Sequence, residues 1–286
     1  MVSITRKAEF SASHFCYNAA LSEEQNFALY GKASGRNGHG HNYVVEVTVQ
    51  GEVDPVTGMV MDLKDLKTIL EREVIAPFDH RFLNHEVAPF DRLIPTPENI
   101  AREIWRRLAG HLNQPGRRLA NVRLYETPDL TWSTVNEDRA DEERSVTTLT
   151  RRYSFCASHR LHTARLNDDE NARVFGKCNN PFGHGHNYFL DVTVGGEIDP
   201  LTGLVASPAA LDACVERAVL SRLDHSSVNT DVPEFRETVP TTENLVFQIA
   251  RWLEAAWPQK AGVPAGRLAH IRLEETGSNT VELKVS

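Results

Sequence analysis

The sequence has few cysteines, no long apolar run and no excess of positive charge. Four cysteines in 286 residues are too few for a disulfide framework, so we expect a reducing, cytoplasmic location. No stretch approaches the roughly 18 consecutive apolar residues of a membrane span, and the N-terminal MVSITRKAEFSASH lacks the apolar core of a secretory signal. A formal charge of −8 disfavours nonspecific binding to nucleic acid. We therefore expect neither a membrane nor a nucleic acid as a partner.

The composition is that of an ordinary globular protein, but the length exceeds one domain. Hydrophobic residues make up 41% and charged residues 24% of the chain, values that argue against disorder and collagen-like repeats. A chain of 286 residues is longer than a typical single domain, so two domains are expected.

The two expected domains are copies of one sequence. Residues 37–62 read NGHGHNYVVEVTVQGEVDPVTGMVMD and residues 182–207 read FGHGHNYFLDVTVGGEIDPLTGLVAS, with 16 of 26 positions identical at an offset of 145. The later motif RLANVRLYET (118–127) returns as RLAHIRLEET (267–276) at an offset of 149. A period this long indicates duplicated domains rather than a solenoid of small units.

A charged segment separates the two copies. Residues 136–146, NEDRADEERSV, hold seven charges and no large apolar residue before Val146. This composition is typical of a solvated linker. We therefore expect a first domain at 1–135, a linker at 136–146 and a second domain at 147–286.

Each copy contains two pairs of extended segments. In the first copy, residues 3–10 and the β-branched residues 42–50 favour an antiparallel pair of strands. Residues 121–125 and 131–135 favour a second pair near the end of the copy.

Two helices are expected between these strand pairs. Asp62 suits the N-cap of an amphipathic helix with apolar residues at 63, 66, 69, 70 and 74, and Thr96-Pro97 begins a second helix. In the second copy, Ser207-Pro208 and Thr241 begin the corresponding helices. The order ββααββ predicts an α+β fold in which two helices pack on one face of an antiparallel sheet.

Three histidines recur in each copy with the spacing of metal ligands. The two histidines of HGH alternate by two, so on a strand both rings project from one face, and a third histidine comes from the preceding segment. Three imidazoles leave a fourth tetrahedral position open, as in catalytic zinc sites, although such a set also accepts other divalent ions. Recurrence in both copies makes the weak HGH motif persuasive and predicts one metal site per copy. The two sets are His14, His39 and His41, and His159, His184 and His186.

Cys178 is the one cysteine in a polar, glycine- and asparagine-rich loop, GKCNNPFGHGHNY. An isolated cysteine is usually a small buried hydrophobe, but the neighbouring Lys177 and a metal at the histidines would favour the reactive thiolate. The first copy has Ala33 at this position. The three other cysteines have no cysteine counterpart, and we interpret them as structural.

Two further acidic motifs recur. Asp79-His80 and Asp224-His225 either cap a helix end or form a carboxylate-oriented histidine that relays protons; the sequence favours neither. Glu126 and Glu275 end apolar strands, where a carboxylate is either a strand-edge surface group or an anchor for a ligand with two adjacent N–H donors.

Together these motifs resemble the 6-pyruvoyltetrahydropterin synthase family. The second copy carries FCASHRLH, FGKCNNPFGHGHNY, GEIDPLTG, LDHSSVN, VPTTENL and RLEET, and the first carries FSASHF, NGHGHNY, GEVDPVTGMVMDL, FDHRFLN, IPTPENI and RLYET. The resemblance covers nearly all of both copies. It implies two tandem tunnelling-fold (T-fold) domains, whose ββααββ units form barrels of antiparallel strands with helices outside. It also implies a homo-oligomer with active sites at subunit interfaces, where Cys178 works either with Asp224 and His225 or with Asp79 and His80 of a first copy.

The resemblance assigns roles to the recurring residues of the second copy. It makes the three histidines zinc ligands, Cys178 the base, and Asp224 and His225 the partner acid/base pair. It makes Glu275 the anchor of a pterin ring. The further residues that it places along the pocket are Thr241, Thr242 and Glu243.

The first copy matches this pattern only in part. Its three histidines correspond to the zinc ligands, Asp79 and His80 to the acid/base pair, and Glu126 to the anchor. Ala33 replaces the base, so a metal and a pterin pocket without turnover is the expectation for this copy.

The activity implied by the resemblance is the zinc-dependent conversion of 7,8-dihydroneopterin 3′-triphosphate to 6-pyruvoyltetrahydropterin, a step of tetrahydrobiopterin biosynthesis. Triphosphate is eliminated, and the second copy is the expected catalyst. Candidate partners of the triphosphate are Lys32, Arg36, Arg173 and Lys177.

Two alternatives remain. The 6-carboxytetrahydropterin synthases of the deazapurine pathway act on the same substrate, and many have three residues between the cysteine and HGH. Here five residues, NNPFG, separate Cys178 from His184, which favours the pyruvoyl type. The other alternative is a zinc- and pterin-binding module without catalysis.

Overall fold

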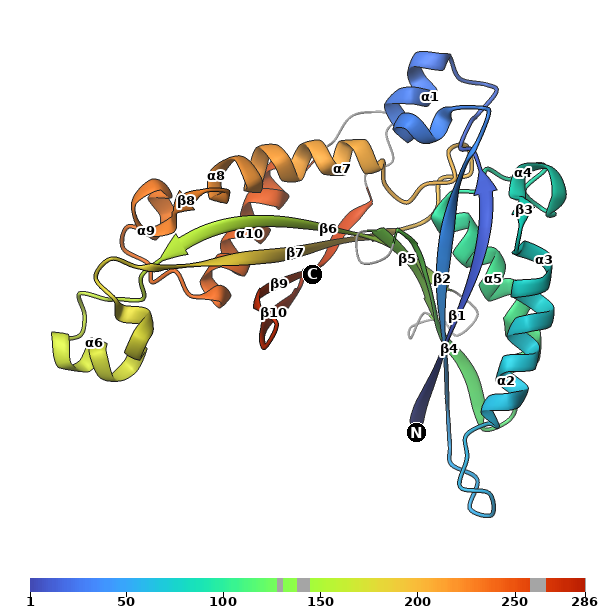
Figure 1. The fold of residues 1–286 in the computed structure, drawn as a ribbon, viewed down its shortest axis with the longest axis horizontal. Coiled ribbons are helices and arrows are strands. Elements are labelled where there is room, and N and C mark those ends of the chain that lie inside the picture. The colour runs from blue at the N-terminus through green and yellow to red at the C-terminus, as the bar shows by residue number, and fades with distance from the viewer. Residues whose placement is uncertain (128–130, 138–144, 258–265, 286) are drawn as a thin grey trace. The chain divides into compact units, whose positions relative to one another are not determined.

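A computed structural model describes residues 1–127, 131–137, 145–257 and 266–285 (Figure 1). The chain divides into two compact units. Unit 1 comprises residues 1–151, 194–209 and 261–267, and unit 2 comprises residues 152–193, 210–260 and 268–286. Unit 1 therefore holds the whole first sequence copy together with a segment of the second. Of the expected linker, residues 138–144 lie outside the described residues, whereas its first two and last two residues belong to strands.

Unit 1 is built on an antiparallel sheet. Strands β1 (Val2–His14) and β2 (His39–Gly51) pair along their whole length, from Val2 opposite Gly51 to His14 opposite His39. β4 (Arg117–Thr127) pairs with β2, and β5 (Thr131–Glu137) pairs with β4 and with the first residues of β6 (Ser145–His159). The two-residue β3 (Arg81–Phe82) adds the one parallel contact, to β1. All four strands expected in the first copy are confirmed, and β1 extends far enough to include His14.

The two predicted helices of unit 1 lie on the same side of these strands (Figure 1). α2 (Leu63–Leu70) begins after Asp62, whose side chain accepts a hydrogen bond from the Lys64 amide, and continues into the π-helical η2 (Glu71–Ile75). α5 (Pro97–Leu112) begins after Thr96, which caps it as predicted. Leu66, Leu70 and Val74 are fully buried, but Leu63, expected on the apolar face, is 48% exposed because it lies at the first turn of the helix.

Short elements that the sequence analysis did not anticipate join the regular ones. Between β1 and β2 lie α1 (Glu23–Tyr30), which begins with a capping box between Ser22 and Gln25, and the 3₁₀ helix η1 (Gly31–Ser34). Between α2 and α5 lie α3 (Ala76–Phe78) and α4 (Leu83–Glu86).

Unit 2 repeats this order of elements. Thr241 caps α10 and Pro208 begins α7, as predicted. The core repeats as well, because Tyr188 stacks on Phe155 with ring centroids 4.9 Å apart, as Tyr43 stacks on Phe10 at 5.0 Å in unit 1. After β6, the elements of the second copy are α6 (Asp168–Phe175), η3 (Gly176–Asn179), β7 (His184–Gly196), α7 (Pro208–Val215), η4 (Glu216–Leu220), α8 (Ser221–Leu223), β8 (Ser226–Ser227), α9 (Val228–Asp231), η5 (Pro233–Phe235), α10 (Thr242–Ala256), β9 (Arg267–Thr276) and β10 (Asn279–Lys284).

The α+β class and the tandem ββααββ pattern are thus confirmed, and each unit has the tunnelling fold. None of the described helices combines the length and the apolar character that crossing a membrane requires.

Residues 201–205, from the second sequence copy, cover the start of α5 in unit 1. The Thr96 hydroxyl donates to the Gly203 carbonyl at 2.6 Å, and the Val205 amide donates to Glu98 Oε1 at 3.2 Å. Glu98 is 1% exposed, and burial raises its pKa to about 7. Its counterpart in the second copy, Glu243, is exposed.

Glu98→Gln is expected to stabilise the protein in a pH-dependent way. The pKa of Glu98 is about 7 in the folded chain, whereas an ordinary glutamate has a pKa of 4.5. Between these pH values the folded chain therefore binds a proton that the unfolded chain has lost, and the stability of wild type falls as the pH rises. Glutamine carries no charge, so the variant does not lose stability in this way. The difference in unfolding free energy, variant minus wild type, should therefore increase by roughly 2–3 kcal/mol between about pH 5 and about pH 8. Urea denaturation at both pH values measures this difference. A flat difference for Glu98→Gln contradicts the prediction.

Candidate metal centre and active site

Unit 2 brings three imidazoles together where two strands meet the loop between them. His159 is the last residue of β6, and His184 and His186 begin β7. The ring centroid of His159 lies 4.6 Å from that of His184 and 5.2 Å from that of His186, and the Nε2 atoms of His159 and His184 are 3.2 Å apart. Two nitrogens bonded to one tetrahedral zinc ion would be about 3.3 Å apart. This spacing therefore suits a shared cation.

Unit 1 repeats the arrangement. His14 ends β1 opposite His39 at the start of β2, and His41 follows on the same face. The centroid of His14 lies 4.5 Å from that of His39 and 5.4 Å from that of His41. Both trios expected from the sequence are therefore brought together, because strand pairing places the end of one strand beside the alternating histidines of the next.

A backbone carbonyl orients the buried histidine of each trio. Nδ1 of His14 donates to the Pro95 carbonyl at 2.7 Å, and Nδ1 of His159 donates to the Pro240 carbonyl at 2.8 Å. A proton held on Nδ1 leaves the lone pair of Nε2 free to bind a metal. The sequence analysis missed this role of the two prolines. Their recurrence at the same place in both copies was the available signal.

The trios fit a bound cation. Four of their buried ring nitrogens make no hydrogen bond with any described residue: Nε2 of His14, His41 and His186, and Nδ1 of His184. Buried polar atoms nearly always have a partner, and neutral imidazole is a common ligand of zinc and related metals. With three ligands per trio, one tetrahedral position stays open for a substrate oxygen or water.

The two trios differ in their electrostatics. In unit 2, burial lowers the pKa of His159, and burial and the neighbouring His186 lower the pKa of His184. In unit 1, burial likewise lowers the pKa of His39, to about 4. His14 behaves differently: burial opposes its protonation, but interactions with Cys16 and Glu126 outweigh burial and raise its pKa to about 10. Near neutral pH, His159 and His184 are therefore held in the neutral form that a metal binds, whereas His14 holds a proton.

A carboxylate lies beside each trio. Glu275 Oε1 is 3.7 Å from His159 Nε2 and 3.9 Å from His186 Nε2, and it accepts a hydrogen bond from the Thr242 hydroxyl at 2.9 Å. In unit 1, the Oε1 atom of Glu126 is 3.4 Å from His14 Nε2, but Pro97 occupies the position of Thr242, so this donor is missing. Glu275 is thus a half-buried acceptor whose geometry is set by a neighbouring hydroxyl.

The other residues that the resemblance placed along the pocket surround the start of α10. The Thr241 side chain accepts a hydrogen bond from the Asn244 amide and caps the helix. Thr242 is buried against Glu275, and Glu243 points its carboxylate to an exposed surface. Of Thr241, Thr242 and Glu243, only Thr242 forms a hydrogen bond with Glu275, the carboxylate beside the histidine trio.

Each Asp-His pair lies at the end of a short helix and places a carboxylate beside an imidazole. Asp224 follows the last turn of α8, where its Oδ1 accepts the Cys156 amide at 2.9 Å and its Oδ2 lies 3.0 Å from His225 Nδ1. These contacts hold the pKa of Asp224 below its ordinary value. His225 has a φ of +57°, an uncommon conformation for a residue with a side chain, and its imidazole is 82% exposed. The carboxylate therefore orients an accessible ring, as a proton relay requires. Asp79 and His80 repeat this geometry.

Cys156 is a residue near this pair that the sequence analysis interpreted as structural. Its Sγ lies 3.7 Å from Asp224 Oδ1, whereas Ser11 occupies the equivalent place beside Asp79. Cys16 and Cys214 are buried, in keeping with a structural role. Cys156 and Asp224 are far apart in sequence, so no local pattern indicates that they are in contact. Only an alignment of the two copies, which places Cys156 opposite Ser11, would have drawn attention to this position.

Cys178 lies in the turn that leads to β7. It is part of η3, its side chain is half-buried, and its carbonyl accepts the Leu161 amide at 2.9 Å, two residues beyond His159. Ala33 makes the same backbone contact with Cys16 in unit 1. The backbone around the missing thiol is therefore preserved, and the copies differ here in the side chain.

A family model described as 6-pyruvoyl tetrahydropterin synthase matches residues 3–137 and 148–285 of the chain. A 6-pyruvoyl tetrahydrobiopterin synthase of Poecilia reticulata is 48% identical over 134 residues, which are 46% of this chain and 86% of that protein. The protein of the same name from Homo sapiens is 46% identical over 136 residues, 48% of this chain and 90% of that one.

Two further relatives widen the comparison. A putative 6-carboxy-5,6,7,8-tetrahydropterin synthase of Archaeoglobus fulgidus is 42% identical over 97 residues, 34% of this chain and 74% of that protein. The solved structure of Caenorhabditis elegans 6-pyruvoyl tetrahydropterin synthase is 38% identical, covers 49% of this chain and 96% of that one, and superposes with a TM-score of 0.46.

Zinc added to the metal-free protein is expected to displace more protons from the first trio than from the second. At about pH 7.5, His14 is protonated because its pKa is about 10, whereas the pKa values of His159 and His184 are lowered. Two variants isolate the trios: His184→Ala/His186→Ala leaves the first, and His39→Ala/His41→Ala leaves the second. Calorimetric titration in buffers of different ionisation enthalpy should give more protons released per zinc for the first trio than for the second. Equal release from both variants would refute the assigned protonation states.

Proposed function

Because the chain belongs to the 6-pyruvoyl tetrahydropterin synthase family, a family of lyases, we propose that it converts 7,8-dihydroneopterin triphosphate to 6-pyruvoyltetrahydropterin and releases triphosphate. The observation that carries this proposal is the histidine trio of unit 2, in which the Nε2 atoms of His159 and His186 lie within 4 Å of Glu275 Oε1. The same unit carries Cys178 and the Asp224–His225 pair, so the second copy is the proposed catalyst. Four free cysteines support a cytoplasmic location.

Zinc is the proposed metal, held by His159, His184 and His186, and when bound it would polarise the oxygens of the substrate side chain and acidify the neighbouring C–H bonds. The Pro240 carbonyl keeps the proton of His159 on Nδ1, which leaves Nε2 for the metal. Thr242 holds the Glu275 carboxylate, which is positioned to accept two N–H groups of a pterin ring.

Proton transfer is assigned to two groups. Cys178 is proposed to remove protons from carbon as the thiolate. His225, exposed and oriented by Asp224, is proposed to exchange protons with the side-chain oxygens. Thr241 and Glu243 are proposed to lie along the same pocket.

The first copy is proposed to bind a metal and not to turn over substrate. It has His14, His39 and His41 together, Glu126 beside them, and the Asp79–His80 pair, but Ala33 cannot accept a proton.

The 6-carboxytetrahydropterin synthase alternative stays open because a relative of that name is also similar to this chain. The five residues between Cys178 and His184 favour the pyruvoyl product. A binding module without catalysis is disfavoured by the complete set of acid/base groups in unit 2.

The zinc-loaded chain is expected to give a 6-pyruvoyl product and one triphosphate per turnover. Anaerobic incubation with 7,8-dihydroneopterin triphosphate, followed by mass-resolved product analysis, measures both. Cys178→Ala should lower the turnover number by a factor of about 100 or more, since a general base typically contributes 10²–10⁴-fold, and should leave the zinc content unchanged. A 6-carboxy product with acetaldehyde would identify the alternative enzyme, and no turnover with bound zinc and pterin would identify a binding module.

Ala33→Cys is the matched control for that thiol. If the first copy lacks only its base, activity per chain should rise in this variant and should partly return in Cys178→Ala/Ala33→Cys. Unchanged activity would show that the first copy lacks more than the thiol. Near-wild-type activity of Cys178→Ala would contradict the role assigned to Cys178.

We also propose that the chain is a homo-oligomer with sites completed between copies. In unit 1, Leu204 and Val205 are 2% exposed where they cover Glu98. In the first copy, the residue that matches Leu204 is Met59, which is 44% exposed, and the carboxylate that matches Glu98 in the second copy, Glu243, is also exposed. Residues 56–60 of one chain are therefore proposed to cover Glu243 of another.

Met59→Asp is expected to weaken this association, because it places a charge against a surface that carries Glu243. Light scattering coupled to size-exclusion chromatography should give a mass of at least two 32.1 kDa chains for wild type and a shift toward one chain for the variant. Val174→Asp, at an exposed apolar residue of α6, serves as the control and should keep the wild-type mass. A monomeric wild type contradicts the proposal.

A further inference from the structure

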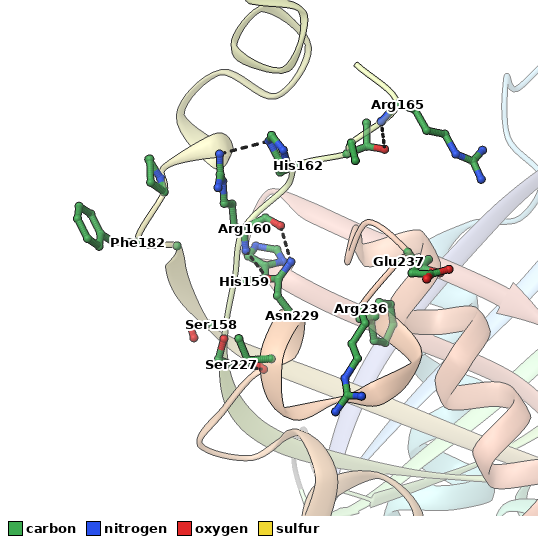
Figure 2. A pocket seen from close by; sticks show the side chains of 17 residues that line it. Ser158, His159, Arg160, His162, Arg165, Phe182, Ser227, Asn229, Arg236 and Glu237 are labelled. Atoms are coloured by element: carbon green, nitrogen blue, oxygen red, sulfur yellow. Dashed lines mark hydrogen bonds between the residues drawn. The ribbon is translucent and has the colours of Figure 1, made fainter. Parts of the chain in front are cut away.

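A cavity of about 730 Å³ opens beside His159 in unit 2 (Figure 2). Three stretches of chain line it: residues 158–165 after β6, residues 181–183 before β7, and residues 227–238 after β8. One proposed zinc ligand, His159, therefore borders the cavity, and the remaining lining residues come from the rest of these three stretches.

Positive charge dominates the lining. Arg160, Arg165 and Arg236 all border the cavity, together with one acidic residue, Glu237. None of the three arginines forms an ion pair with a residue in the described part of the chain. Three arginine residues that border one cavity and have no carboxylate partner among the described residues favour an anionic ligand.

Arg160 is the most constrained of these cations. Its Nε donates to the side-chain oxygen of Asn179 at 3.0 Å, and its Nη2 lies 3.2 Å from His162 Nδ1. Figure 2 shows Arg160 between His159 and His162. The guanidinium is therefore held in place, which reduces the entropy lost on binding a ligand.

The first copy provides an internal comparison, because the same positions there hold different chemistry. Phe15 stands in place of Arg160, Ala20 in place of Arg165, and Asp91 in place of Arg236. The Phe15 ring packs against Phe82 and His85 at centroid distances of 5.9 and 6.0 Å.

These aromatic rings occupy space that the second copy leaves open. Phe82 and His85 are replaced by the smaller Ser227 and Thr230, both of which line the cavity. Phe82 also lies so close to Gly38 that an added Cβ there would be 2.7 Å from its ring. The first copy therefore has an aromatic cluster where the second has a basic cavity.

We propose that this cavity binds the polyphosphate group of a ligand whose pterin end lies at the histidine trio. This inference rests on the proposed function and assigns the phosphate end of its substrate to Arg160, Arg165 and Arg236. It differs from the expectation from the sequence, which considered Lys32, Arg36, Arg173 and Lys177; none of these lines the cavity. Glu237 opposes the bound anion, so its removal should strengthen binding.

The test uses inorganic triphosphate and the full-length, zinc-loaded chain. Calorimetry should detect binding that weakens with added salt, as expected for charge pairing with exposed arginines. Arg165→Ala/Arg236→Asp, which introduces the residues of the first copy at two exposed positions, should raise the dissociation constant at least tenfold. Glu237→Gln should lower it. Zinc content measured after each titration excludes removal of the metal by triphosphate.

Arg92→Ala is the matched control, because Arg92 is exposed and stands in the first copy at the position of Glu237. The affinity of the Arg92→Ala variant for triphosphate should stay within twofold of wild type. In turnover, Arg165→Ala/Arg236→Asp should raise KM for the pterin triphosphate about tenfold and leave kcat within about twofold. Wild-type affinity and KM in this variant, or no triphosphate binding by wild type, would overturn the subsite. Triphosphate binding that depends on these arginines in a chain without turnover would support the subsite and refute the proposed function instead.

Discussion

The hydrogen bond from a buried histidine to a proline carbonyl holds each site together. It joins the last residue of a strand, His14 or His159, to the turn that precedes the long helix. The next residue of that turn, Thr96 or Thr241, caps the helix. One contact thus fixes the position of the helix start, the tautomer of the ring and the direction of its metal-binding nitrogen. Because both histidines are buried, water cannot replace the carbonyl, and losing the contact would leave a buried donor unsatisfied.

The features that the sequence predicted are those carried by local patterns. His39 and His41 alternate with the period of a strand, and Asp62 and Thr96 precede helices as N-caps do; in each case neighbouring residues determine the outcome. Duplication strengthened these predictions, since each pattern occurs twice. The α+β class followed from the same local signals.

The features that the sequence did not predict depend on contacts between distant residues. Pro240 lies 81 positions from His159, and Asp224 lies 68 positions from Cys156. No periodicity connects such pairs, because tertiary packing alone brings them together. The inclusion of residues 194–209 in unit 1 has the same origin: the contact of Val205 with Glu98 spans the two copies, so the limits of the sequence repeat do not coincide with those of the compact units.

The two copies keep one backbone and differ in the side chains around it. Ala33 stands for Cys178, Pro97 for Thr242, and Phe15 for Arg160. Thr242 donates a hydrogen bond to Glu275, Cys178 is proposed to transfer protons, and Arg160 is proposed to bind an anion; the first copy lacks all three groups. The strand pairing that places His14 beside His39 is retained, since it depends on backbone hydrogen bonds and not on those side chains. The backbone that brings the histidines together is therefore independent of the side chains proposed to act in turnover.

The contrast between Glu98 and Glu243 connects chemistry to assembly. The first copy, which lacks the thiol, has its buried carboxylate covered by residues of the same chain. The second copy, which carries the complete set of reactive groups, leaves the equivalent carboxylate exposed. A carboxylate that keeps its ordinary hydration cannot act as a fixed, desolvated group beside a ligand. In the proposed assembly, the site of the second copy is therefore complete only when a second chain covers Glu243. The site of the first copy, whose Glu98 is covered by the same chain, is complete once that chain has folded.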